Sequence, residues 1–156
     1  MKLEDMKYEA GIQQERAEKR SRIIEYLHKV QDQNPQQYLT EDKLKACAEE
    51  FNLTMAEVYG IAGYYSMFSL KPRGKYIIRL CKSSVCHMMG AESIGDKLED
   101  LCNTIFGETS QDELFTLEFA ECLGHCEKAP SMMINKEVHG HLTVEKIEEI
   151  IENLKK

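Results

Sequence analysis

Two cysteine pairs constrain the fold of this chain more than any other feature of its sequence. Cys81 and Cys86 are separated by four residues, and Cys122 and Cys126 are separated by three. Closely spaced cysteines in a chain that we expect to be cytosolic are typical of metal binding rather than of disulfide bonds. The fold must therefore be one that brings two distant pairs of thiols to the same place.

Each pair follows a segment with the pattern of a β-strand. Residues 75–80 (KYIIRL) predict a short strand, and residues 115–121 alternate, with the apolar side chains on one face. Residues 90–105 between them have the apolar spacing of a helix. If the two strands are neighbours in a β-α-β unit, the loops that follow them leave the sheet at one edge. This arrangement would gather the four thiolates.

The rest of the C-terminal half completes this unit. Residues 132–134 and 138–141 predict a hairpin, and Thr143 is a candidate N-cap of a last helix. The predicted order is β-α-β-β-β-α, which is the thioredoxin-like arrangement. We assign it to one domain, residues 75–156.

Residues 1–74 have a different pattern and predict a small helical bundle. Apolar side chains recur at helical spacing over residues 23–30 and 44–51, and a capping box begins a further helix at Thr54. The Lys-Pro-Arg-Gly sequence at residues 71–74 is the best domain boundary. The predicted fold class is therefore α+β.

Four thiolates suit a 2Fe–2S cluster, in which each iron keeps two thiolates beside two bridging sulfides. Structural zinc also takes four thiolates at such spacings, so a zinc-stapled interaction module without a redox role remains open at this point. A thiol redox enzyme would need a C-x-x-C motif, and the chain has none. Cys47 and Cys102 fall on apolar helix faces, where we expect them to be buried and not to bind metal.

Charge and composition exclude several other functions. Residues 75–156 hold 9 basic and 15 acidic side chains of a chain with net charge −7, which disfavours nucleic-acid binding. No apolar run approaches the roughly 20 residues of a membrane helix, and the charged N-terminus is not a signal peptide, so we expect a cytoplasmic location. The chain has neither a G-x-G-x-x-G motif nor a Walker-type loop, and we identify no catalytic residue in it.

A few other side chains have two readings. His87 and His125 adjoin the cysteines, and we expect them to be solvent-facing loop residues. Tyr64, Tyr65 and Phe68 could form a docking patch, but packing in the core is the preferred interpretation.

Beyond the cysteines, several short motifs occur in a distinctive order. These are Cys81-x4-Cys86 with Met89-Gly90-Ala91, then Gly107-Glu108-Thr109, Phe115-Thr116-Leu117-Glu118, Cys122-Leu123-Gly124-His125-Cys126 and Ala129-Pro130. With them the chain resembles, over roughly residues 22–154, the thioredoxin-like 2Fe–2S ferredoxin subunit of NADH-oxidising complexes. Gly63-Tyr64 departs from the Thr-Phe pair that the family pattern has before Tyr65.

The resemblance implies a specific function. Cys81, Cys86, Cys122 and Cys126 would be the only cluster ligands, which excludes zinc more firmly than their spacing does. Members serve in respiratory complex I, in NAD-reducing or electron-bifurcating iron hydrogenases and in NAD-linked formate dehydrogenases. We expect a non-catalytic electron-carrying subunit of such an NADH-dependent oxidoreductase, with a hydrogenase slightly favoured.

The resemblance also implies the partners. The N-terminal bundle would pack on a larger subunit that holds the flavin mononucleotide (FMN) and the NAD(H) site, neither of which lies on this chain. A further iron–sulfur or hydrogenase subunit would complete the assembly.

Overall fold

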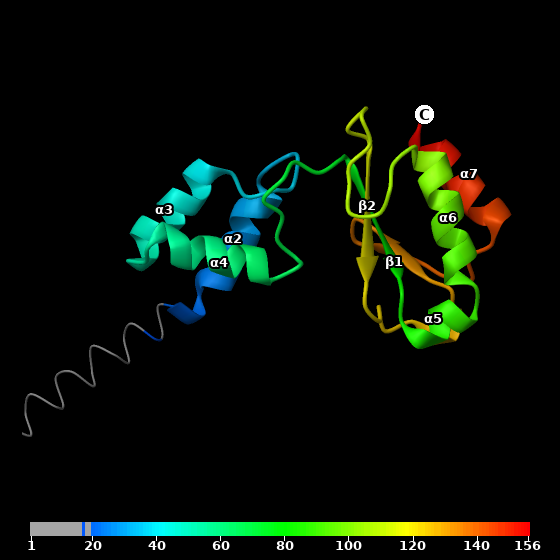
Figure 1. Ribbon diagram of the computed structural model, residues 1–156, viewed down its shortest axis with the longest axis horizontal. Helices are drawn as coiled ribbons and strands as arrows, with labels where there is room; N and C mark the ends of the chain where they lie inside the picture. Colours follow the sequence, from blue (N-terminus) through cyan, green and yellow to red (C-terminus); the bar gives the residue numbers. More distant parts are fainter. Residues whose placement is uncertain (1–16, 18–19) are drawn as a thin grey trace, which may run out of the picture. The chain divides into compact units, whose positions relative to one another are not determined.

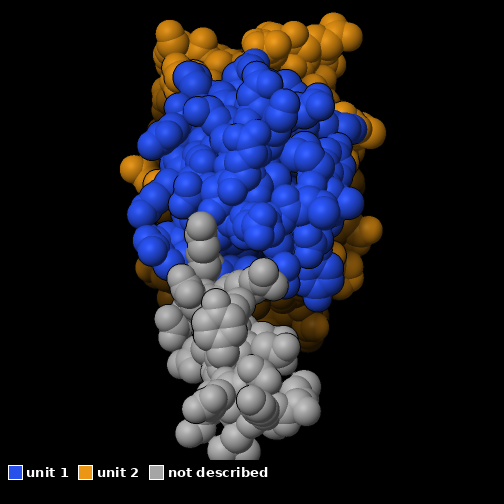
Figure 2. Space-filling view, turned by 90° about the vertical axis from the view of Figure 1, so that its left-hand side faces the viewer, with its two compact units in different colours: residues 1–72 blue, residues 73–156 orange. Residues whose placement is uncertain are grey.

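The chain forms two compact units. The computed structural model describes residue 17 and residues 20–156, so the start of the predicted N-terminal bundle, residues 1–16, lies outside the described residues. Unit 1 ends at Pro72 and unit 2 comprises residues 73–156. Figure 1 shows the elements of both units, and Figure 2 colours the units separately. Among the described residues, no helix is both long enough and apolar enough to cross a membrane.

Three helices build the described part of unit 1. They are α2 (Ile23–Asp32), α3 (Glu41–Phe51) and α4 (Met55–Tyr64). Asn52 adopts the left-handed conformation (φ 50°) that ends α3, and the capping box predicted at Thr54 is present at the start of α4. The helices bury one apolar side each: Leu27 of α2, Leu44 and Cys47 of α3, and Val58 of α4.

A buried glutamine ties the segment after α4 to α2. Gln31 donates from Nε2 to the Met67 carbonyl (3.0 Å), and its Oε1 accepts from the Ser69 N–H (2.8 Å). These bonds hold Phe68 in the core between them.

The two tyrosines just before this segment are exposed, whereas Phe68 is buried. Tyr64 is 81% exposed and Tyr65 is also exposed, so the prediction that they pack in the core is wrong. Their rings contact each other edge to face, with centroids 5.1 Å apart. The end of α4 thus presents aromatic surface to solvent.

Unit 2 has the predicted α+β, thioredoxin-like architecture. Its elements are β1 (Tyr76–Cys81), α5 (Ser84–Met88), α6 (Ala91–Cys102), β2 (Phe115–Ala120), the 3₁₀ turn η1 (Cys126–Lys128), β3 (Met132–Ile134), β4 (Glu137–His139) and α7 (Val144–Leu154). The sheet order is β2-β1-β3-β4, with β1 and β2 parallel and the other neighbours antiparallel. The Thr143 hydroxyl caps α7 by accepting from the Lys146 N–H, as predicted. The short helix α5 was not predicted.

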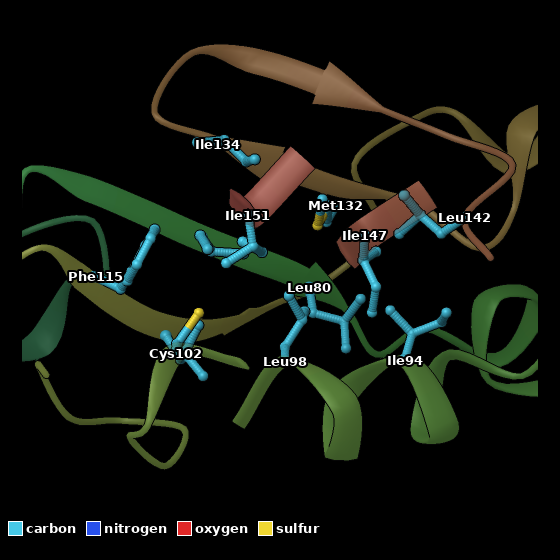
Figure 3. Close-up of a cluster of buried hydrophobic side chains, with 12 residues drawn as sticks. Leu80, Ile94, Leu98, Cys102, Phe115, Met132, Ile134, Leu142, Ile147 and Ile151 are labelled. Atoms are coloured by element: carbon cyan, nitrogen blue, oxygen red, sulfur yellow. The ribbon is translucent and has the colours of Figure 1, made fainter. Parts of the chain in front are cut away.

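The core of unit 2 lies between the sheet and helices α6 and α7, which lie on the same side of β1 and β2 (Figure 1). Figure 3 shows Leu98 of α6, Leu80 of β1 and Ile147 of α7 converging in this layer. Alternate residues of β1 and β2 face it because side chains of a strand alternate between the two faces of its sheet. This core fixes the strands whose ends carry the cysteine pairs.

Two predicted core positions lie outside this layer. The helix α6 ends at Cys102 because Asn103 adopts the left-handed conformation (φ 50°), so Ile105 is exposed rather than inward. Phe119, near the C-terminal end of β2, is also exposed, and its ring stacks on that of Phe106 with centroids 3.9 Å apart.

Arg73 and Gly74 belong to unit 2, two residues before the predicted boundary. The Gly74 N–H donates to Thr116 Oγ1 (2.7 Å). Arg73 Nε lies 3.0 Å from Glu118 Oε1, an ion pair whose N–H is not aligned for a hydrogen bond. These contacts fix the chain against β2 before β1 begins.

We expect Gly74→Ala to destabilise unit 2. A Cβ atom at this position would lie 2.8 Å from backbone atoms of Phe115, closer than packed atoms approach, so β2 would have to shift. Overpacking of this kind costs about 1–3 kcal/mol of unfolding free energy. Urea denaturation followed by circular dichroism measures the loss.

The matched control is Gly63→Ala in α4. An added Cβ there meets nothing within 4 Å, and alanine stabilises a helix interior by roughly 0.5–1 kcal/mol. Equal stability of the Gly74→Ala protein and the parent would contradict the close approach of residue 74 to β2.

Candidate metal centre

The two cysteine pairs lie at one edge of the sheet. Cys81 is the last residue of β1 and is paired with Ala120, the last residue of the parallel strand β2. The Lys82 N–H donates to the Ala120 carbonyl (2.9 Å), so the segments that follow β1 and β2 leave the sheet side by side, toward Cys86 and Cys122 respectively. Figure 1 shows α5 at this end of β1 and β2. The prediction that both loops leave the sheet at one edge is confirmed.

The short helix α5 places Cys86. Ser83 is extended and precedes the helix, and its carbonyl accepts from the His87 N–H (2.9 Å). This single turn brings the chain back toward the sheet, so Cys86 is only 2% exposed and lies beside the equally buried Cys81. The first pair therefore forms the inner side of the site.

The second pair forms the outer side. Cys122 and Cys126 are exposed, and their Sγ atoms are 3.5 Å apart. Gly124 has φ +79°, which lets the three-residue loop close on itself, and its N–H lies 3.4 Å from Cys122 Sγ. Two sulfurs on one tetrahedral metal at about 2.3 Å are ~3.8 Å apart. The spacing of this pair therefore fits two ligands of one metal ion.

Leu123 joins the two pairs. Its side chain packs against the small buried cluster of Cys81, Cys86, Ala91 and Ala129. All four thiols therefore surround one small region, with the buried pair on one side and the exposed pair on the other.

The thiol groups affect each other's protonation. Burial by itself raises the pKa of Cys81, but hydrogen bonds from the Ser83 N–H, the Cys86 thiol and the Leu123 N–H outweigh it, and the pKa is lowered. The pKa of Cys126 is raised, first by its hydrogen bond with Cys122 and then by the negative charge that Cys122 would carry. Two thiolates at this distance repel each other, and a bound cation would relieve the repulsion.

The four sulfurs are arranged as two pairs rather than as one shell. Within residue 17 and residues 20–156, no three His, Cys, Asp or Glu side chains are placed to hold a single metal ion. A mononuclear zinc site needs four ligands around one point, whereas a 2Fe–2S cluster needs two thiolates at each of two irons. Two pairs of cysteines match the two thiolates that each iron of a 2Fe–2S cluster needs.

The other sequence candidates lie outside this arrangement. His125 is exposed, and its Nδ1 lies 3.4 Å from Glu127 Oε1. His87 is exposed on α5. Cys47 and Cys102 are buried in the apolar cores of units 1 and 2, which confirms their predicted burial.

One residue beside the site was missed by sequence reasoning. Ser131 is 1% exposed, and its Oγ lies 3.6 Å from Cys86 Sγ. No local pattern marks it, because it lies 45 residues after Cys86 and approaches it only through the pairing of the chain beside β1. The Ala129-Pro130 motif immediately before it was the only signal nearby.

We expect the metal-free chain to be alkylated selectively by iodoacetamide. Burial raises the pKa of Cys47 and of Cys102 to about 11, so at about pH 8 roughly one thousandth of either thiol is the reactive thiolate. Cys122 and Cys126 are exposed and should be labelled first, as peptide mass spectrometry would show. Labelling of Cys102 at the rate of Cys122 in the folded chain would contradict the burial.

The same two thiols affect stability at high pH. Their folded pKa of about 11 lies above the ordinary value of 9.0, so the unfolded chain loses these protons first. Stability should therefore be unaffected by them below about pH 9 and should fall as the pH rises toward 11. Replacing both with alanine should reduce this part of the pH dependence in urea denaturation.

Comparison with known proteins supports the interpretation of the four cysteines as a 2Fe–2S site. Residues 9–155 match the family described as thioredoxin-like [2Fe-2S] ferredoxin. One subunit of the NADH-quinone oxidoreductase of Escherichia coli K12 is 38% identical over 136 residues, which cover 87% of this chain and 81% of that protein.

Two further similarities are more limited. The corresponding NADH-quinone oxidoreductase subunit of Mycobacterium tuberculosis H37Rv is 34% identical over 138 residues, 88% of this chain, but this chain spans only 54% of that protein's length. In the crystal structure of the air-oxidised NAD+-reducing [NiFe]-hydrogenase, the matching chain superimposes with a TM-score of 0.76 at 22% identity. That match covers 86% of this chain and 23% of the other, and it shows a shared fold.

Proposed function

This chain belongs to the thioredoxin-like [2Fe-2S] ferredoxin family, and we propose that it carries one 2Fe–2S cluster as an electron-transfer subunit of an NADH-dependent oxidoreductase. The ligands would be Cys81, Cys86, Cys122 and Cys126. The observation that carries the proposal is the meeting of the two loops, where Leu123, from the loop that holds the exposed pair, packs against the buried Cys81 and Cys86. A bound cluster supplies reversible uptake of one electron.

The residues of this chain would hold and shield that group. The buried Cys81 and Cys86 would bind one iron, and Cys122 and Cys126, whose sulfurs are 3.5 Å apart, would bind the other. The pKa of Cys81 is lowered, against the effect of its burial, by hydrogen bonding from the Ser83 and Leu123 N–H groups, and such donors stabilise thiolates that share negative charge with a cluster. The exposed pair lies on the side from which an electron can enter.

We propose that the electron is exchanged with FMN on a partner subunit, which would also bind NAD(H). This chain has no nucleotide-binding motif of its own, so it needs a partner at each end of the transfer. Val85 and Met88 of α5 and Met89, which follows the helix, are exposed and form apolar surface near the buried Cys86, which is typical of a contact region.

Unit 1 offers a second contact surface for such a partner. A groove of about 510 Å³ lies between α2 and α4, and its lining includes Ile23, Gly60, Ile61 and the exposed Tyr64. Apolar, aromatic-lined grooves commonly receive partner side chains. The proposed role of unit 1 is therefore docking.

Three kinds of assembly are candidates, and the relatives bear on two of them. The similar fold in an NAD+-reducing hydrogenase supports our preferred assignment to an NAD(P)-linked or electron-bifurcating hydrogenase. The 38% identity to a component of an NADH-quinone oxidoreductase supports the alternative, the equivalent subunit of respiratory complex I, and an NAD-linked formate dehydrogenase is a third possibility. Native co-purification with identification of the bound subunits distinguishes them: a hydrogen-activating subunit supports the first, and a quinone-linked assembly contradicts it.

Metal analysis tests the cluster against the zinc-stapled module. Protein purified without oxygen should contain two irons and two acid-labile sulfides per chain and should be reddish brown. One zinc per chain, no sulfide and no colour would contradict the electron-carrier proposal.

A further inference from the structure

A buried hydroxyl contacts the inner side of the proposed cluster. Ser131 lies next to the end of β1, where its carbonyl accepts a hydrogen bond from the Cys81 N–H (3.1 Å). Its Oγ is 3.6 Å from Cys86 Sγ, within the range of a hydrogen bond to sulfur, and both residues are almost completely buried. Among the described residues, the Cys86 sulfur is the one hydrogen-bond partner found for this hydroxyl.

The direction of this hydrogen bond follows from the state of the cysteine. In a free thiol either group could be the donor. A cysteine that binds iron has lost its proton, so its sulfur can only accept and the serine must donate. Both groups are buried, and in such surroundings a hydrogen bond to a negatively charged sulfur is strong.

Such a donor favours the more negative state of the group it contacts. Uptake of an electron makes the cluster and its thiolates more negative, and hydrogen bonds to the sulfurs are among the factors that set the reduction potential. A donated hydrogen bond is therefore stronger in the reduced form than in the oxidised form. Its removal should make the cluster harder to reduce.

We propose that Ser131 is a positioning residue that donates a hydrogen bond to the cluster ligand Cys86 and thereby raises the reduction potential of the cluster. The inference rests on the proposed function, because it requires a cluster on these cysteines. It adds to that function a residue that binds no iron and lies outside both cysteine motifs.

The test is potentiometric titration of the full-length cluster-loaded chain and its Ser131→Ala variant, followed by visible absorption. The variant should keep two irons per chain, and its equilibrium constant for reduction should fall roughly three- to tenfold. A tenfold fall corresponds to ~59 mV for a one-electron couple. Ser131→Thr, which retains the hydroxyl, should restore most of the lost potential.

The matched control is Ser110→Ala. Ser110 is also buried, but it lies near the opposite end of β2 from the cysteines. Its hydroxyl donates a hydrogen bond to the Asp112 carboxylate and accepts one from the Phe115 N–H. This variant should lose stability without a change in potential. A Ser131→Ala chain with intact cluster and unchanged potential, or one that loses its iron, would overturn the tuning role. A parent chain without a 2Fe–2S cluster would instead contradict the proposed function itself.

Discussion

Replacing Cys81 with alanine should leave the protein with almost no bound iron, a fall from two irons per chain to about zero. Cys81 lies where the two loops meet, buried beside Cys86 and against Leu123 of the other loop. Without Cys81, one iron of the proposed cluster would lack one of its two thiolate ligands. Iron and sulfide analysis with visible absorption spectroscopy measures the result.

The same substitution should also lower stability. A bound metal group stabilises the fold by its binding free energy, which the variant would lack. The melting temperature of the Cys81→Ala chain should therefore match that of the metal-free parent rather than that of the loaded parent.

The control for this prediction is Cys102→Ala. Cys102 lies in the same unit and is 3% exposed. It belongs to the core between α6 and the sheet and not to the small buried cluster around Cys81 and Cys86. This variant should keep two irons per chain and lose about 1 kcal/mol from its small cavity. Full iron content in Cys81→Ala, or loss of iron in Cys102→Ala, would contradict the assignment of ligands.

Leu98→Ala should lower the unfolding free energy of unit 2 more than Gly74→Ala, Leu101→Ala or Cys102→Ala. Leu98 is completely buried between α6, β1 and α7, beside Leu80 and Ile147 (Figure 3). Removing a buried leucine side chain costs roughly 2–5 kcal/mol because apolar contact is lost and a cavity remains. Chemical denaturation of the metal-free chain measures this loss without a contribution from the cluster.

Leu101→Ala on the same helix provides the comparison. Leu101 is only partly buried at the margin of the core, so its removal leaves less of a cavity and should cost clearly less. Equal losses for the two variants would contradict the position of the core between α6 and the sheet.

The strands and the paired cysteines could be predicted from the sequence because their signals are local. The apolar run before Cys81 and the alternation before Cys122 each lie within a few residues, and parallel pairing of β1 with β2 then brings the loops to one edge. The capping box at Thr54 was predictable for the same reason, since its two partners are three residues apart.

Other features depend on contacts between distant residues or on short segments. The five-residue helix α5 is too short to show helical periodicity, so the position of Cys86 was expected in a loop. The packing of Leu123 against Cys81 and the hydrogen bond between Ser131 and Cys86 arise only from the folded pairing of the loops. The exposure of Phe119 results from its place near the C-terminal end of β2, where its ring stacks on that of Phe106.

Electron paramagnetic resonance of the anaerobically purified, dithionite-reduced protein tests the central claim most directly. The account predicts one S = 1/2 signal that integrates to one spin per two irons and disappears on reoxidation. A reduced protein that retains its metal but has no such signal would contradict a 2Fe–2S cluster on these four cysteines.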